Sequence, residues 1–215
     1  MSSSPALPQR PCPWTASVYE QMVLATGNNG KIREFRELLA PLAVTIKAQS
    51  ELGIDSPAET GLTFVENALI KARHAAKKTG MPTLADDSGL VVSALDGAPG
   101  LYSSRYAGSD ASDLDNIKRL LQEMKSTPMA QRHAFFYSVV VFLRHPTDPA
   151  PLIAEGRWQG IILEQPRGEA GFGYDPLFFL PEKNCTAAEL DSAEKNSCSH
   201  RGRATARLLE LLTGS

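Results

Sequence analysis

The sequence has few cysteines and no long hydrophobic run. Three cysteines occur in 215 residues, and none is in a CxxC pair, so neither a disulfide framework nor a zinc ribbon is expected. The longest apolar stretch, residues 134–143, is interrupted by Ser138 and is shorter than the about 18 residues that a membrane span needs. These absences exclude a membrane protein and favour a reducing compartment, which we take to be the cytoplasm.

An excess of basic residues is also missing. Lys and Arg number 22 against 24 Asp and Glu, which gives a net charge of −2 and no basic block. A protein dedicated to duplex DNA normally carries a basic surface, so nucleic acid is not the expected partner. The apolar content of 42% is typical of an ordinary globular chain, and a small-molecule ligand is the remaining expectation.

The first residues differ in composition from the rest. Residues 1–18 contain four prolines and no apolar segment of the kind a signal peptide needs. We therefore expect a flexible N-terminal extension there and a single domain over residues 19–215, since a domain commonly has about 100–200 residues.

Hydrophobic periodicity predicts both strands and helices along residues 19–215. Capping boxes begin at Thr63 and Thr186, and Ser199 is expected to cap the last helix. Strands are expected at residues 22–25, 90–95, 135–143, 152–158 and 160–164, and helices at 31–39, 63–76, 116–124 and 199–212. This mixture predicts an α/β fold around one mixed sheet.

A glycine-rich segment, ATGNNGK at residues 25–31, lies between a predicted strand and a predicted helix. Backbone N–H groups at a helix N-terminus attract phosphate, and glycines allow a close approach. Lys31 adds a cation. The segment is not a P-loop, because Gly27 and Gly30 are too close together and Ile32 stands where that motif needs Ser or Thr. A plain strand-to-helix turn is the alternative.

Two adjacent acids, Asp86 and Asp87, are followed by Ser88 and Gly89. The pair is expected at the end of one strand, with a Ser-Gly turn leading to the next. Successive side chains of an extended chain point to opposite faces, so one acid can bind a metal while the other orients water. Mg²⁺ suits carboxylate oxygens beside a phosphate. A solvated Asx turn is the alternative.

Glu59 precedes the cap at Thr63, and Lys71 follows on the polar side of the same predicted helix. Glu59 can project toward a site, whereas an isolated lysine on a polar face is usually exposed.

Near the C-terminus, glycines flank Phe172, and a ring freed in this way can stack on a nucleobase or pack over the sheet. Lys195, His200 and Arg201 cluster at the start of the last predicted helix, where their donors suit a keto oxygen or a phosphate.

Six segments occur in an order and spacing that match a known family: ATGNNGK (25–31), ETGLTFVENALIKA (59–72), ADDSGL (85–90), GAPGLYSSRYAG (97–108), GFGYDP (171–176) and SHRGRA (199–204). Together they resemble the inosine triphosphate pyrophosphatase family, also called dITP/XTP pyrophosphatases, in its bacterial form. The resemblance covers residues 19–212 and implies an elongated mixed sheet flanked by helices, with two lobes and a central cleft. It also implies a homodimer and a Mg²⁺-dependent cleavage of ITP, dITP and XTP to the monophosphate and pyrophosphate, which cleanses the nucleotide pool.

The resemblance also implies roles for individual residues. Asp87 matches the general base and a metal site, Asp86 the neighbouring acid, and Glu59 a metal-associated carboxylate. Lys71 matches a triphosphate contact that acts in catalysis. The matched substrate-binding residues are Thr26, Gly27, Asn28, Asn29, Gly30, Lys31, Ser88, Phe172, Gly173, Tyr174, Asp175, Lys195, His200 and Arg201.

Two other functions are compatible with these motifs. One is a pyrophosphatase for modified pyrimidine triphosphates, and the other is a non-catalytic nucleotide-binding protein. The adjacent acids argue against the second, because a pure binder gains little from carboxylates beside a triphosphate.

Overall fold

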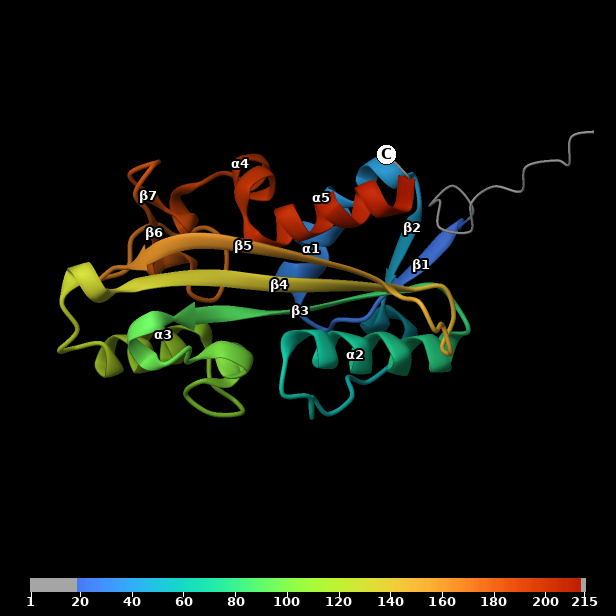
Figure 1. The fold of residues 1–215 in the computed structure, drawn as a ribbon, viewed down its shortest axis with the longest axis horizontal. Coiled ribbons are helices and arrows are strands. Elements are labelled where there is room, and N and C mark those ends of the chain that lie inside the picture. The colour runs from blue at the N-terminus through green and yellow to red at the C-terminus, as the bar shows by residue number, and fades with distance from the viewer. Residues whose placement is uncertain (1–18, 214–215) are drawn as a thin grey trace, which may run out of the picture.

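The computed structural model describes residues 19–213, so the expected extension at residues 1–18 lies outside the described residues. Its centre is a seven-stranded sheet in the order β2-β1-β3-β4-β5-β6-β7. Strand β1 runs parallel to β2 and β3, and the other neighbours are antiparallel. The predicted mixed α/β sheet is therefore confirmed (Figure 1).

The strands are β1 (Gln21–Leu24), β2 (Thr45–Ala48), β3 (Thr83–Val92), β4 (His133–Leu143), β5 (Leu152–Ile162), β6 (Phe178–Leu180) and β7 (Cys185–Thr186). The α-helices are α1 (Asn29–Leu38), α2 (Phe64–Thr79), α3 (Asp113–Glu123), α4 (Ser192–Cys198) and α5 (His200–Thr213). Short 3-10 turns are η2 (Ala40–Leu42), η3 (Gln49–Leu52), η4 (Ser93–Leu95), η5 (Gly100–Arg105), η6 (Met129–Gln131), η7 (Asp175–Leu177) and η8 (Ala187–Glu189).

The caps lie where the sequence predicts them. Thr63 Oγ1 accepts from the backbone N–H of Glu66 at the start of α2, and Ser199 Oγ accepts from Gly202 N at the start of α5. The capping box at Thr186 is present but begins only the 3-10 turn η8. Helix α4 was not predicted, because its seven residues carry no long apolar period.

The expected turn at Ser88 and Gly89 is wrong: both residues lie inside β3, which pairs with β4 along its whole length. Gly89 serves a close approach instead, because a Cβ there would stand 2.3 Å from the carbonyl oxygen of Gly100. The expected break before Gly160 is wrong for a similar reason. Strand β5 continues through it, and a Cβ would stand 2.7 Å from the ring of Phe178.

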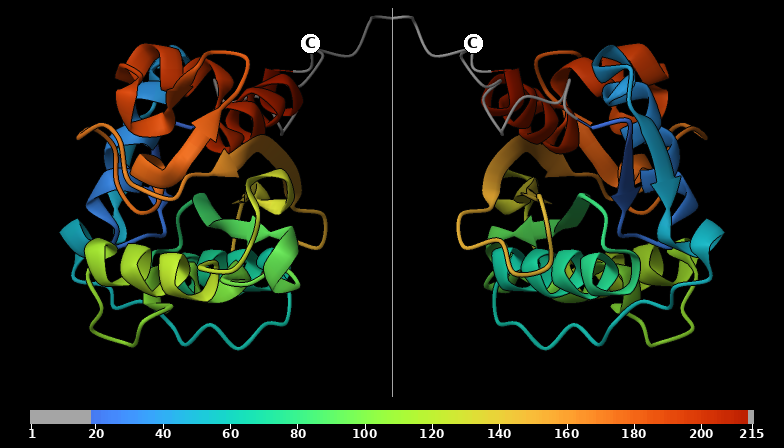
Figure 2. Two further views of the ribbon diagram at one scale, coloured as in Figure 1. Left: turned by 90° about the vertical axis from the view of Figure 1, so that its left-hand side faces the viewer. Right: turned by 90° about the vertical axis from the view of Figure 1, so that its right-hand side faces the viewer.

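The long strands carry two groups of core residues. Near β1, helix α2 covers one face of the sheet, while α1 and α5 cover the other (Figures 1 and 2). At the far end, Leu90 and Val92 of β3 pack in a second core with side chains of α3, η7 and β6. Residues 86–89 of β3 lie between these two cores. The fold therefore places the polar middle of β3 between two lobes.

No helix within residues 19–213 has the length and apolar character to cross a membrane. In the same residues, Cys185 and Cys198 are free thiols.

Candidate active site

Two adjoining cavities open beside the middle of β3. One has a volume of about 510 Å³ and is lined by Thr26, Gly27, Asn28, Lys31, Ser56, Pro57, Glu59, Lys71, Ser104 and Arg105. The other, of about 120 Å³, contains Asp87, Ser88, Phe172, Lys195, His200 and Arg201 among its walls. Both are lined by Asn28, Lys31, Glu59 and Ser104. Most of the residues predicted from sequence therefore meet in one continuous cleft.

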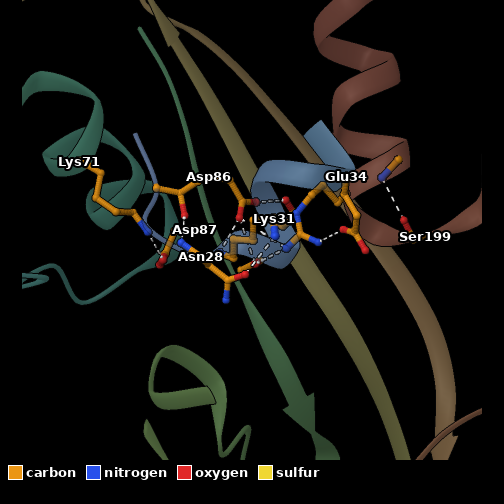
Figure 3. Close-up of polar contacts among 12 residues, drawn as sticks. Asn28, Lys31, Glu34, Lys71, Asp86, Asp87 and Ser199 are labelled. Carbon is orange, nitrogen blue, oxygen red and sulfur yellow. Dashed lines mark hydrogen bonds and ion pairs between the residues drawn. The ribbon is translucent and has the colours of Figure 1, made fainter. Parts of the chain in front are cut away.

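At one end of this cleft a lysine joins two carboxylates. Lys71 Nζ lies 2.6 Å from Asp87 Oδ1 and 3.0 Å from Glu59 Oε1. Lys71 comes from α2 and Asp87 from β3 (Figure 3). Glu59 comes from the loop before α2. Lys71 is only 7% exposed, so it is not the ordinary exposed lysine that the sequence alone favours. Its burial is tolerated because both carboxylates compensate its charge.

The neighbouring acid, Asp86, faces the other way. It is fully buried, and its Oδ2 lies 2.6 Å from Lys31 Nζ while Oδ1 accepts from Ser138 Oγ at 2.5 Å. Ser88 Oγ also donates to Oδ2, at 3.2 Å. The alternation of a strand explains this division, since Asp86 and Asp87 lie next to each other in β3. Asp87 is among the lining residues of the cleft and Asp86 is not.

The two aspartates differ in proton affinity. Burial favours the neutral form of Asp86, but the Lys31 and Arg201 charges outweigh burial and hold its pKa far below the usual range. Burial raises the pKa of Asp87 above its ordinary value, because Lys71 and Lys31 compensate only in part. Burial of Lys71 is outweighed by Asp87 and Glu59, so the pKa of the Lys71 ammonium is raised. Asp87 is therefore the better proton acceptor of the pair.

Residues 25–31 form the capped start of α1 at the edge of the cleft. Asn28 caps α1, and its Oδ1 accepts from the backbone N–H of Lys31 at 3.0 Å. Thr26 Oγ1 accepts from Asn28 N at 3.2 Å. The N-terminus of α1 consequently faces the cleft beside Lys31, which suits an anionic ligand. Asn29 is exposed and lines neither cavity.

At the other end of the cleft, Phe172 stands over two cations. Its ring centroid lies 4.9 Å from Lys195 Nζ and 5.7 Å from Arg201 Cζ. Asp175 holds this arrangement, because its Oδ2 accepts from Phe172 N at 2.9 Å and from Lys195 Nζ at 2.6 Å. Gly173 N donates to Asp113 Oδ2 at 2.6 Å, which ties the same loop to α3. Phe172 thus lies in the cleft rather than in the core.

Glu34, which was not among the residues predicted from sequence, organises the donors at this end. Its Oε1 accepts from Lys195 Nζ at 2.8 Å, and its Oε2 accepts from Arg201 Nη1. Arg201 Nη2 also donates to Ser88 Oγ at 2.9 Å and lies 3.5 Å from Asp86 Oδ2. Lys195 and Arg201 are therefore already bound to carboxylates. A usable signal existed: Glu34 lies three residues after Lys31 on α1, so the two residues share one side of the helix.

His200 and Tyr174 are both buried. The His200 ring stacks on Phe136 at a centroid distance of 4.8 Å, and burial holds its pKa well below the usual value. His200 therefore presents a neutral imidazole. Tyr174 is 3% exposed, and its hydroxyl donates to the carbonyl of Ser103 at 2.9 Å.

Gly30 supports Phe172 although it lines neither cavity. A Cβ at this position would stand 2.7 Å from Phe172 Cδ1. We predict that Gly30→Ala raises the KM for a substrate that stacks on Phe172, while the melting temperature does not fall, because Ala favours a helix over Gly. Steady-state kinetics and thermal unfolding measure both quantities. In a Phe172→Ala background the same change should have no further effect on KM, and an unchanged KM in the wild-type background would refute the contact's importance.

The residues also fit a divalent cation. Within residues 19–213, no group of three or more His, Cys, Asp or Glu side chains is placed to hold a metal ion. Mg²⁺, however, is usually held by one or two carboxylates together with phosphates and water. Glu59 and Asp87 supply such a pair, because both already converge on the Lys71 ammonium.

A separate cavity of about 710 Å³ lies over β5 and β6, and none of the predicted site residues lines it. It lacks the paired acids of the cleft, so the chemistry is assigned to the cleft.

Comparison with known proteins identifies a family. Residues 22–211 match the Ham1 family. The dITP/XTP pyrophosphatase of Pectobacterium atrosepticum is 57% identical over 193 residues, which are 90% of this chain and 98% of that protein. The dITP/XTP pyrophosphatase of Escherichia coli K12 is 55% identical over 193 residues, with the same coverage of both chains.

Solved structures have the same fold. A HAM1 protein from Coxiella burnetii superimposes with a TM-score of 0.83 at 49% identity, covering 91% of this chain and 99% of that one. The Staphylococcus aureus Ham1 protein gives a TM-score of 0.79 at 39% identity, covering 90% and 98%. The family resemblance seen in the sequence motifs is confirmed, and the chain belongs to the Ham1 family.

Proposed function

We propose that this chain hydrolyses the deaminated purine nucleotides ITP, dITP and XTP to the monophosphate and pyrophosphate, and so cleanses the nucleotide pool. The observation that supports this proposal most is that Lys71 contacts both Asp87 and Glu59. All three line a cleft that also contains the N-terminus of α1. The names of the relatives, dITP/XTP pyrophosphatase, support the same activity.

The proposed reaction is direct attack of water on the α-phosphorus. Asp87 takes a proton from the water while the water oxygen bonds to the α-phosphorus. The bond between the α-phosphorus and the bridging oxygen breaks, and pyrophosphate leaves with its electron pair. Asp87 suits this role by position, because it lines the cleft whereas Asp86 does not. Asp86 holds Lys31 and Arg201 in place and acts as a positioning residue in this scheme.

Charge on the leaving pyrophosphate is neutralised by Lys31 and Lys71, together with the dipole of α1. Phosphoryl transfer depends mainly on such electrostatic and positioning effects. In the proposal, Glu59 and Asp87 hold Mg²⁺, which when bound supplies Lewis acidity and orients water. No Ser or Cys nucleophile is required.

Selection of the base rests on the far end of the cleft. Hypoxanthine and xanthine carry an oxygen at position 6, where adenine carries an amino donor. N–H donors of Lys195, His200 or Arg201 pair with that oxygen in the proposal, and Phe172 stacks on the ring. ATP offers no acceptor at position 6 to the N–H groups that Glu34, Asp175 and Asp86 leave free, and a buried donor without a partner is penalised. Guanine shares the 6-oxo group, so a further contact near its 2-amino group is needed to exclude GTP.

The test is pyrophosphate release from a panel of purine and pyrimidine triphosphates, with Mg²⁺ and with a chelator. We expect ITP, dITP and XTP to be cleaved faster than ATP, GTP and the pyrimidine nucleotides, and the chelator to stop the reaction. Fastest cleavage of a modified pyrimidine triphosphate would favour that alternative. Binding without pyrophosphate release from any nucleotide would identify a non-catalytic nucleotide-binding protein.

The proposal also covers the assembly, the compartment and the partners of the protein. We propose a homodimer in the cytoplasm that acts on free nucleotides rather than on nucleic acid. The net charge of −2 supports the last point, because binding to nucleic acid depends on neutralising phosphates with Lys and Arg.

A further inference from the structure

Arg105 reaches the cleft from the lobe opposite Lys31. It ends the 3-10 turn η5, which follows β3 toward the second core. Its Nη1 donates to Glu59 Oε2 at 2.9 Å, and its Cζ lies 5.3 Å from the centroid of the Tyr102 ring. About a third of the side chain, 34%, is exposed. Arg105 is therefore a partly solvated residue on the wall of the 510 Å³ cavity, unlike a buried structural arginine such as Arg132.

We propose that Arg105 is a further ligand of the polyphosphate, and that it binds the two terminal phosphates from the side opposite α1. This inference rests on the proposed function and deepens it. Among the described residues that line this cavity, the cations are Lys31, Lys71 and Arg105. The first two come from the lobe around β1, whereas Arg105 alone comes from η5. A polyphosphate in the cavity is then held between the lobes.

The charges explain why Arg105 is the cation most available to a ligand. Lys31 is bound to buried Asp86, and Lys71 is shared by Asp87 and Glu59. Among residues 19–213, Glu59 is the one acid paired with Arg105, and it is contacted through a single nitrogen. A guanidinium has five N–H donors in a planar fork that matches phosphate. Most of the N–H donors of Arg105 can therefore bind a ligand while the hydrogen bond to Glu59 is kept.

Glu59 also couples this arginine to the metal expected in the cleft. Its two oxygens are taken by Lys71 and Arg105. A metal cation bound by Glu59 competes with Lys71 and Arg105 for its oxygens. The Arg105 side chain is the freer of the two to move, since it is partly exposed while Lys71 is buried. With a cation bound to Glu59, the Nη1 donor of Arg105 also becomes available to phosphate oxygens, in addition to the donors that are already free.

The test is binding of inorganic pyrophosphate to the full chain by titration calorimetry, in the presence of a chelator. We expect Arg105→Ala to weaken pyrophosphate binding about tenfold or more, as loss of a charge-assisted phosphate contact would, and Arg105→Lys to weaken it less. Inosine monophosphate should bind both variants as it binds the wild type, because it lacks the terminal phosphates. Arg119→Ala is the matched control, since Arg119 is an exposed arginine on α3 that pairs with Glu123.

A purely structural arginine gives a different pattern. If Arg105 only holds Glu59 in place, Arg105→Ala binds pyrophosphate in chelator as tightly as the wild type does, or it loses affinity for inosine monophosphate to the same extent. Either result overturns the proposal. The proposal also fails if the wild type releases pyrophosphate from ITP yet does not bind pyrophosphate. By contrast, a wild type that releases pyrophosphate from no nucleotide overturns the proposed function itself.

Discussion

Replacing Asp87 with asparagine is expected to slow pyrophosphate release from ITP by about a hundredfold to ten-thousandfold, the usual contribution of a general base. The substitution keeps the size of the side chain but removes its ability to take a proton from water. Lys71 keeps Glu59 as a partner, at 3.0 Å, so the fold should persist. Single-turnover kinetics measures the chemical step, while circular dichroism and nucleotide titration check folding and binding.

The matched control is Glu210→Gln, which removes a negative charge from an exposed position of α5 that lines neither cavity of the cleft. Its turnover should equal that of the wild type. A folded Asp87→Asn protein that binds ITP and retains near-normal turnover would show that Asp87 is not the base.

Replacing Arg201 with alanine is expected to lower the free energy of unfolding by about 3–5 kcal/mol, the cost of breaking a buried ion pair. Arg201 is 2% exposed and contacts Glu34, Ser88 and Asp86. Its loss leaves Glu34 with Lys195 alone and removes one of the charges that stabilise Asp86. Chemical denaturation measures the effect. Arg207→Ala, six residues further along α5 and exposed, should change stability by no more than about 0.5 kcal/mol.

The same Arg201 variant should lose selectivity where it remains folded. We expect the ratio of kcat/KM for ITP to that for ATP to fall, because the variant lacks a donor that we propose for position 6 of the base. Arg201→Lys separates the two effects, since it keeps a positive charge but not the fork of donors. A ratio that is unchanged in both variants would remove Arg201 from base recognition, and a stability loss below about 1 kcal/mol would contradict the buried network.

The sequence predicted elements better where local signals agree with tertiary packing. The cap at Thr63 and the apolar period after it predicted α2 well. Two predictions at glycines inside strands were wrong, a turn at Gly89 and a break before Gly160. In the structure each gives room to a neighbour, the carbonyl of Gly100 or the ring of Phe178. Only the packing of distant segments distinguishes these uses of glycine.

The site shows the same limit. Motifs along the chain predicted Asp87, Lys31 and Phe172, because each stands in a short pattern with a chemical meaning. The partners that set their charge come from far away: Glu34 lies 161 residues before Lys195, and Arg105 lies 46 residues after Glu59. No local pattern marks such pairs. Their charges are compensated only after the sheet brings α1, α4 and α5 together.

The most direct test of the account is the position of the cleaved bond. ITP should be hydrolysed in water enriched in the heavy oxygen isotope, and both products analysed by mass spectrometry. Attack on the α-phosphorus predicts that one heavy oxygen enters inosine monophosphate and that pyrophosphate stays unlabelled. Label in pyrophosphate, or in free phosphate, would contradict the mechanism in which Asp87 activates water beside the α-phosphate.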